Sequence, residues 1–223
     1  TDLILLPVLL SYTKLRNLDK KREFRLRQLT QFDKIWLALS KLSLEALDAF
    51  GVLGRLRQQP TAIERIHVSR VGDFGRVLLN ASDFGHAAFG GVVLAQDLGH
   101  ALSEQVASLK STQRICPANL AGCSLDGPVA ELSLQTPDGV QRIHARWVAA
   151  ADGMQSFIRG ALGIGTLEHD YRQSVFVCSL QAEKASDGTA YERFSEQGPV
   201  ALLPMADGQY GAICGVASEQ EQA

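Results

Sequence analysis

The distribution of glycine is the feature of this chain that most limits its fold. The 223 residues include 20 glycines, and none of them precedes Gly51. Glycines normally follow the first strand of a dinucleotide-binding domain, because they allow the tight turn and let the backbone approach a pyrophosphate. Residues 3–6 have the apolar character of an opening strand, but a proline and bulky side chains come next. The sequence therefore predicts that this strand has no glycine-rich phosphate loop after it.

Composition and charge exclude several classes of protein. A net charge of −2 with 46% hydrophobic residues is ordinary for a globular chain and argues against a nucleic-acid binder. The longest apolar run, residues 3–10, is far shorter than the roughly 20 residues that cross a bilayer. No secretory signal pattern is present, so we expect a cytoplasmic protein.

The basic segment near the amino terminus allows two interpretations. Residues 14–27 contain seven basic and two acidic side chains, a local charge of +5. The segment is either a solvated helix face or a contact with an acidic partner or an anionic membrane, which would place the protein peripherally on the inner membrane.

Cysteine and histidine spacing gives no sign of a metal site. The four cysteines form no C-x-x-C pair and the five histidines form no H-x-x-x-H pair. We expect no metal, and we expect the cysteines to be small buried apolar residues: Cys116, Cys123, Cys178 and Cys214.

Periodicity and turn signals predict interleaved helices and strands. Helical spacing covers residues 32–56, with Gly51 as carboxyl cap, and residues 97–109, with Asp97 as amino cap. A further short helix is predicted at 156–162. Strands are predicted at 63–70, 76–81, 114–125, 129–136, 140–150, 174–181, 190–194, 200–204 and 210–216. Because the strands come in hairpins and meanders, we expect an α/β protein with α+β character, built from mixed sheets and two intertwined lobes.

The densest group of polar residues follows the strand predicted at 140–150. Asp152 and Gly153 come at the strand end, and Ser156 and Arg159 follow on the first turn of the next helix. A carboxylate, a hydroxyl, a guanidinium and free backbone N–H groups at such a corner can hold one polar ligand, and arginine suits a phosphate. The alternative is an ordinary turn in which Asp152 caps the helix and Arg159 lies on the surface.

These residues form the pattern D-G-x-x-S-x-x-R, which resembles a motif of the single-component FAD-dependent aromatic hydroxylases. The segments Ala46–Gly51, Ile66–Ser69, Gly91–Val93, Glu192–Phe194 and Gly198–Met205 occur in the same order and spacing as in the ubiquinone-biosynthesis branch of that family. The resemblance begins at about Phe32 and extends to the end of the chain.

The resemblance implies a monooxygenase that uses FAD, NAD(P)H and O2 to hydroxylate a polyprenylated phenol, beside other ubiquinone-biosynthesis enzymes. It implies that Asp152, Gly153, Ser156 and Arg159 bind the cofactor. It implies that one strand faces the substrate through Gly198, Pro199, Val200, Leu202 and Pro204; the alternative for that strand is plain core packing. No catalytic residue can be assigned. The expected FAD-binding lobe is residues 32–60 and 91–165, and the expected substrate lobe is residues 61–90 and 166–223.

Two departures from the family pattern set the remaining expectations. The glycine loop is missing from an atypical basic segment, residues 1–31, and the family's later flavin motif would lie beyond Ala223. We therefore expect an incomplete member of the family, with a partial fold, altered at its amino end, for instance by a shifted reading frame, and with weak FAD binding. The alternatives are a non-catalytic remnant that binds a lipid phenol or a partner enzyme, and a sibling hydroxylase with another aromatic substrate.

Overall fold

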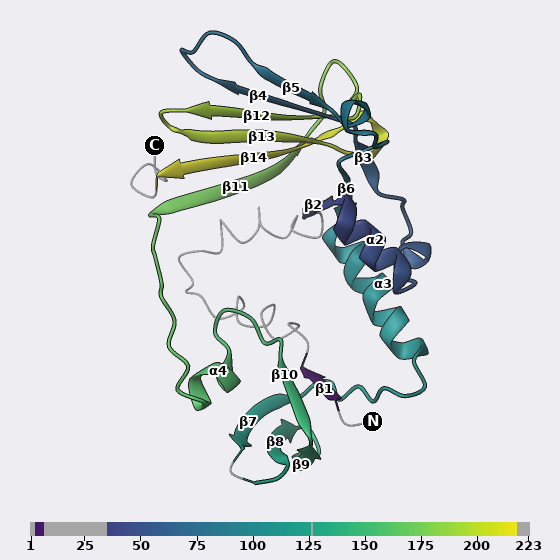
Figure 1. The fold of residues 1–223 in the computed structure, drawn as a ribbon, viewed down its shortest axis with the longest axis vertical. Coiled ribbons are helices and arrows are strands. Elements are labelled where there is room, and N and C mark those ends of the chain that lie inside the picture. Colours follow the sequence, from purple (N-terminus) through teal and green to yellow (C-terminus); the bar gives the residue numbers. More distant parts are fainter. Residues whose placement is uncertain (1–2, 7–34, 126, 218–223) are drawn as a thin grey trace. The chain divides into compact units, whose positions relative to one another are not determined.

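The computed structural model describes residues 3–6, 35–125 and 127–217 (Figure 1). The chain divides into two compact units. The first unit combines residues 1–28 with 109–169, and the second combines residues 29–108 with 170–223. The basic segment 14–27 and the residues that follow the opening strand lie outside the described residues.

The first unit contains a parallel strand pair, an antiparallel meander and a short helix. Strand β1 (Leu3–Leu6) pairs in parallel with β10 (Trp147–Ala150), so that Leu6 lies beside Ala150. The predicted meander is confirmed as β7 (Asn119–Ser124), β8 (Ala130–Thr136) and β9 (Gly139–Ala145). Helix α4 (Phe157–Ala161) confirms the short helix, and Gly163, with φ of +64°, follows its end.

The second unit is dominated by a six-stranded sheet with the order β11-β14-β13-β12-β4-β5 (Figure 1). All its neighbours are antiparallel except β12 and β4, which run parallel, so the sheet is mixed as expected. Its strands are β4 (Arg65–Arg70), β5 (Val77–Asn80), β11 (Gln173–Leu180), β12 (Thr189–Ser195), β13 (Gly198–Pro204) and β14 (Tyr210–Ala217).

A smaller sheet and the two longer helices complete the second unit. The sheet has the order β2-β6-β3. Its strands are β2 (Trp36–Ser40), β3 (Thr61–Ile63) and β6 (Gly90–Leu94). The helices are α2 (Lys41–Ala49) and α3 (Ala95–Ser108), with 3-10 turns at Leu53–Arg55, Ala81–Phe84 and Ala206–Gly208.

Two hydrophobic clusters hold the second unit together. One joins α3 to the turn after α2 through Val52, Leu56, Val93, Leu98 and Ala101. The other joins the small sheet to the six-stranded sheet through Ile63, Val92, Ala190 and Met205, with Trp36 and Leu203 packed against it. Each fully buried Val or Leu contributes about 1.5–3 kcal/mol, so the first cluster fixes α3 against the turn and the second fixes the two sheets of this unit against each other.

The helix predicted over residues 32–56 is wrong at its start. Residues 36–40 form strand β2, which pairs with β6 through contacts that are distant in sequence and that local periodicity does not reveal. The helix begins after Ser40, whose Oγ accepts a hydrogen bond from the N–H of Ser43 at 3.2 Å. It ends before Gly51, whose φ of +72° suits the residue that follows a helix.

Two further predictions are corrected by the structure. Asp97 lies inside the first turn of α3 and is buried, so it is not the amino cap of that helix. Cys116 and Cys178 are exposed and the other two cysteines are half-buried, so the prediction of buried cysteines is wrong. Cys178 lies on β11, an edge strand whose side chains are mostly exposed on both faces.

Within the described residues, no helix has both the length and the apolar character required to cross a bilayer.

Candidate functional site

The strand-to-helix corner predicted from the sequence is formed in the first unit. Asp152 follows β10, and its Oδ2 accepts hydrogen bonds from the backbone N–H groups of Phe157 at 2.8 Å and Ile158 at 3.4 Å. Ser156 is the amino cap of α4, and its Oγ accepts from the N–H of Arg159 at 3.1 Å. Two side chains therefore satisfy the free N–H groups of one short helix.

Arg159 holds the turn closed from the other side. Its guanidinium donates hydrogen bonds to the backbone carbonyl oxygens of Gly153, at 3.5 Å, and Met154. Gly153 has φ of +80°, a conformation that favours glycine, and the space where a Cβ would project is open. The four residues predicted as one site, Asp152, Gly153, Ser156 and Arg159, thus come together in one turn.

The carboxyl group of Asp152 keeps one oxygen available. Burial raises its pKa, but the Ser156 hydroxyl and backbone N–H groups outweigh burial and lower the pKa below its ordinary value. Its Oδ1 is buried and accepts no hydrogen bond from any described residue. A buried acceptor of this kind is costly unless a donor meets it, so the corner fits a ligand with a hydroxyl or N–H group.

The position of this corner in its sheet is also favourable for a ligand. Strands β1 and β10 run parallel and end side by side, with Leu6 next to Ala150, and Asp152 follows two residues later. In sheets with parallel strands, ligands bind outside the carboxyl ends of the strands, where loops and helix ends gather. The acceptor of Asp152 lies at such an edge.

The residues predicted to face a substrate lie on β13, in the second unit. Gly198, Val200, Leu202 and Pro204 share one face of the strand, while Pro199 lies on the opposite face. Val200 is 39% exposed, Leu202 is half-buried and Pro204 is completely buried. Gly198 is required by packing, because a Cβ at this position would lie 1.9 Å from the carbonyl oxygen of Gly215.

An aromatic row lies on the same face as Leu202. Tyr191 pairs with Leu202 across the sheet, and its ring centroid lies 5.5 Å from that of His67 and 6.1 Å from that of Tyr210. Burial, with smaller contributions from Tyr191 and Asp187, raises the pKa of Tyr210. Tyr210 is buried, whereas Tyr191, His67 and Leu202 are half-buried, so these three side chains form the part of this face that a ligand could contact.

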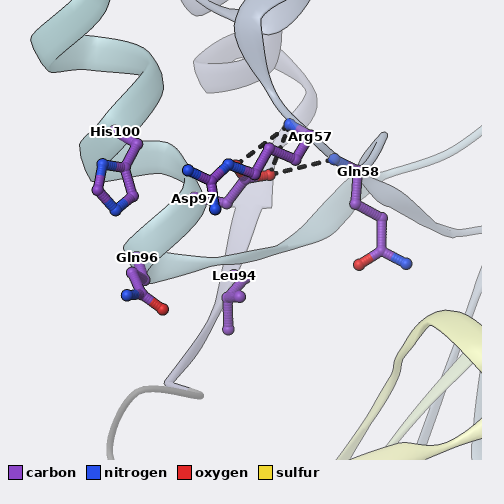
Figure 2. Close-up of a pocket in the computed structure, with 6 residues that line it drawn as sticks. All are labelled: Arg57, Gln58, Leu94, Gln96, Asp97 and His100. Atoms are coloured by element: carbon purple, nitrogen blue, oxygen red, sulfur yellow. Dashed lines mark hydrogen bonds and ion pairs between the residues drawn. The ribbon is translucent and has the colours of Figure 1, made fainter.

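A small pocket in the second unit escaped the sequence analysis. It is lined by Arg57, Gln58, Leu94, Gln96, Asp97 and His100 (Figure 2). Only Asp97 was singled out from the sequence, and it was interpreted as a helix cap. The signal that could have identified the pocket is an acidic residue at an otherwise apolar position beside the buried Leu98.

In the described part of the chain, no group of three or more His, Cys, Asp or Glu side chains is arranged so that it could hold a metal ion.

Comparison with known proteins decides the family. Residues 37–223 match a family described as an FAD binding domain. The chain belongs to this family. The resemblance deduced from D-G-x-x-S-x-x-R is thereby confirmed, and the mixed α/β fold agrees with it. The p-nitrophenol 4-monooxygenase PnpA of Pseudomonas putida matches 83% of this chain and 48% of its own chain, with a TM-score of 0.67 at 16% identity.

Relatives with closer sequences are ubiquinone hydroxylases. The ubiquinone hydroxylase UbiL of Rhodospirillum rubrum is 36% identical over 48% of this chain and 24% of its own length. The 3-demethoxyubiquinol 3-hydroxylase of Escherichia coli is 35% identical over 52% of this chain and 28% of its own length. The chain spans less than half the length of these curated relatives.

The residues present fit FAD at the corner of Asp152. The cofactor carries ribityl and ribose hydroxyl groups, and the buried Oδ1 of Asp152 lacks a donor. The open space beside Gly153 would let the backbone approach such a group. The residues between β1 and β2, where the family's phosphate loop is expected, are outside the described residues.

Proposed function

We propose that this chain is part of an FAD-dependent monooxygenase that hydroxylates a polyprenylated phenol in ubiquinone biosynthesis, with NAD(P)H as electron donor and O2 as oxidant. The observation that carries the proposal is the orphaned Oδ1 of Asp152 at the carboxyl edge of two parallel strands. The ubiquinone hydroxylases among the relatives support the substrate class.

In this proposal each residue of the corner has a separate role. Asp152 accepts a hydrogen bond from a hydroxyl of FAD, while Ser156 and the α4 backbone hold its carboxylate in place. Gly153 leaves room for the cofactor, and Arg159 fixes the turn and places positive charge near the diphosphate. FAD supplies the redox chemistry when it is bound, and the protein supplies position and electrostatics.

The substrate is assigned to the face of β13 that carries Val200 and Leu202. Val200 and Leu202 would contact the polyprenyl phenol there, beside the ring of Tyr191; Gly198, Pro199 and Pro204 shape the strand. The substrate lobe of residues 61–90 and 166–223 is supported by the sheet in which β4 and β5 continue β11–β14. Residues 32–60 and 91–165 are assigned to FAD.

The proposal is tested with purified full chain and a panel of phenols. FAD binding is measured by flavin fluorescence, and NADPH or NADH oxidation is followed together with product analysis by mass spectrometry. Hydroxylated product from a polyprenylated phenol supports the proposal. Saturable binding of the phenol without FAD binding or nucleotide oxidation would instead identify a non-catalytic binding protein, and turnover of an unprenylated phenol alone would identify a sibling hydroxylase.

A further inference from the structure

The pocket beside α3 has a buried acid at its centre. Asp97 is 6% exposed, and it lies one turn before His100 on the helix. Its Oδ1 accepts from the backbone N–H of Arg57 at 3.1 Å, and its Oδ2 accepts from the N–H groups of Arg57 at 2.9 Å and Gln58 at 3.1 Å. The carboxylate therefore fixes the backbone of residues 57–58 against α3.

The side chains around Asp97 are polar but make few bonds of their own. The guanidinium of Arg57 lies 4.0 Å from Oδ1 and is 75% exposed, so it remains available at the rim. The side chains of Gln58 and Gln96 lie on either side of Leu94 in Figure 2. Neither side-chain amide forms a hydrogen bond with another described residue. A carboxylate offers about four acceptor positions, and the two backbone N–H groups leave part of this capacity unused.

Size and charge decide which group fits. The cavity has a volume of about 100 Å³, far below the roughly 300–1,000 Å³ of sites that hold whole drug-sized ligands, so it takes a single ring or a smaller group. A bare phosphate is an anion at neutral pH, so the carboxylate of Asp97 would repel it. A vicinal diol offers two O–H donors to the carboxylate, and an acidic side chain is the usual partner of a ribose hydroxyl in nucleotide sites.

We propose that this pocket binds the ribose of an adenine nucleotide. The ribose hydroxyls donate to Asp97, the amides of Gln58 and Gln96 complete its hydrogen bonds, and the sugar ring lies against Leu94. Arg57, at the rim, meets the phosphate attached to the same ribose. The inference rests on the proposed function, because both FAD and NAD(P)H carry an adenosine that could supply this group.

The test uses the full chain with AMP and 2′-deoxy-AMP as probes, and amide chemical shifts as the readout. Removing one hydroxyl that donates to a charged acceptor weakens binding roughly ten-fold or more. The double variant Gln58→Leu with Gln96→Leu should lose most AMP affinity. Gln59→Leu is the matched control, because Gln59 is exposed, adjacent to Gln58 and not part of the lining.

Arg57→Gln tests the contribution of the rim to binding independently of Asp97 at the centre of the pocket. It should weaken AMP more than adenosine, because only AMP carries the phosphate. Competition then identifies the source of the ribose: displacement of AMP by FAD points to the cofactor, and displacement by NADPH alone points to the electron donor. Either result supports the pocket.

Equal affinity for AMP and 2′-deoxy-AMP overturns the inference. So does a loss of AMP affinity in the Gln59→Leu control that equals the loss in the double variant. Binding of both FAD and NADPH that displaces no AMP and leaves the amides of residues 57–58 unaffected would overturn the inference while leaving the proposed function intact.

Discussion

Replacement of Asp97 by alanine should destabilise the second unit more than replacement of any exposed acid. The carboxylate is buried and is the acceptor for two backbone N–H groups, at 2.9–3.1 Å. Each N–H left without a partner in a buried place costs about 1–3 kcal/mol. Because Arg57 and Gln58 are exposed and water can reach part of the site, we expect a loss in the lower half of the range for two groups, about 2–4 kcal/mol.

The loss is measured by urea denaturation, followed through the fluorescence of Trp36, in a Trp147→Phe background that removes the signal of the first unit. Asp83→Ala is the control, since Asp83 is exposed and, among the described residues, accepts a hydrogen bond only from the side chain of Asn80. We expect the control to change the free energy of unfolding by less than about 1 kcal/mol. A loss below about 1 kcal/mol for Asp97→Ala would refute the reasoning, because the backbone of residues 57–58 would then not depend on the carboxylate.

Three further substitutions test other parts of the fold. Ser156→Ala removes the cap of α4 and should speed hydrogen exchange at the Arg159 amide, at a cost of about 0.5–2 kcal/mol; unchanged exchange would contradict the capping role. Gly198→Ala places a Cβ 1.9 Å from the carbonyl oxygen of Gly215 and should prevent normal pairing of β13, lowering Tm by many degrees; a Tm within a degree or two of wild type would contradict it. Hydrogen bonds from Thr189, followed by the charge of Arg65, lower the pKa of Asp187 below the unfolded value of about 3.9. The stability that this carboxylate contributes is complete above that value and is lost as the pH falls through the folded pKa. Asp187→Asn should therefore flatten the acid limb of a curve of unfolding free energy against pH. An unchanged acid limb would contradict the lowered pKa of Asp187.

The parts of the fold that depend on local signals were predictable from the sequence. Turn residues placed the meander around residues 119–145, and glycine placed the end of α4. Strand β2 was missed because its apolar residues fit a helical spacing, and only its pairing with β6 makes it a strand. The parallel pairing of β1 with β10 joins segments about 140 residues apart, so no local pattern contains it.

The candidate site was predictable to a similar extent. The spacing of D-G-x-x-S-x-x-R brought Asp152 and Ser156 to one helix end, as the structure shows. The roles of the residues were harder to predict, because the sequence does not reveal that Arg159 donates hydrogen bonds to backbone carbonyls within its own turn. The pocket at Asp97 was missed since it joins two segments that are 40 residues apart.

The most direct test of the proposed cofactor site is a fluorescence titration of FAD into the full chain and into Asp152→Ala. Asp138→Ala controls for the loss of an exposed acid in the same unit. We expect saturable but weak binding by the wild type and by this control, with affinity reduced roughly ten-fold or more in Asp152→Ala. Equal binding by Asp152→Ala and the wild type, or no saturable binding by any of them, would contradict the assignment of this corner to FAD.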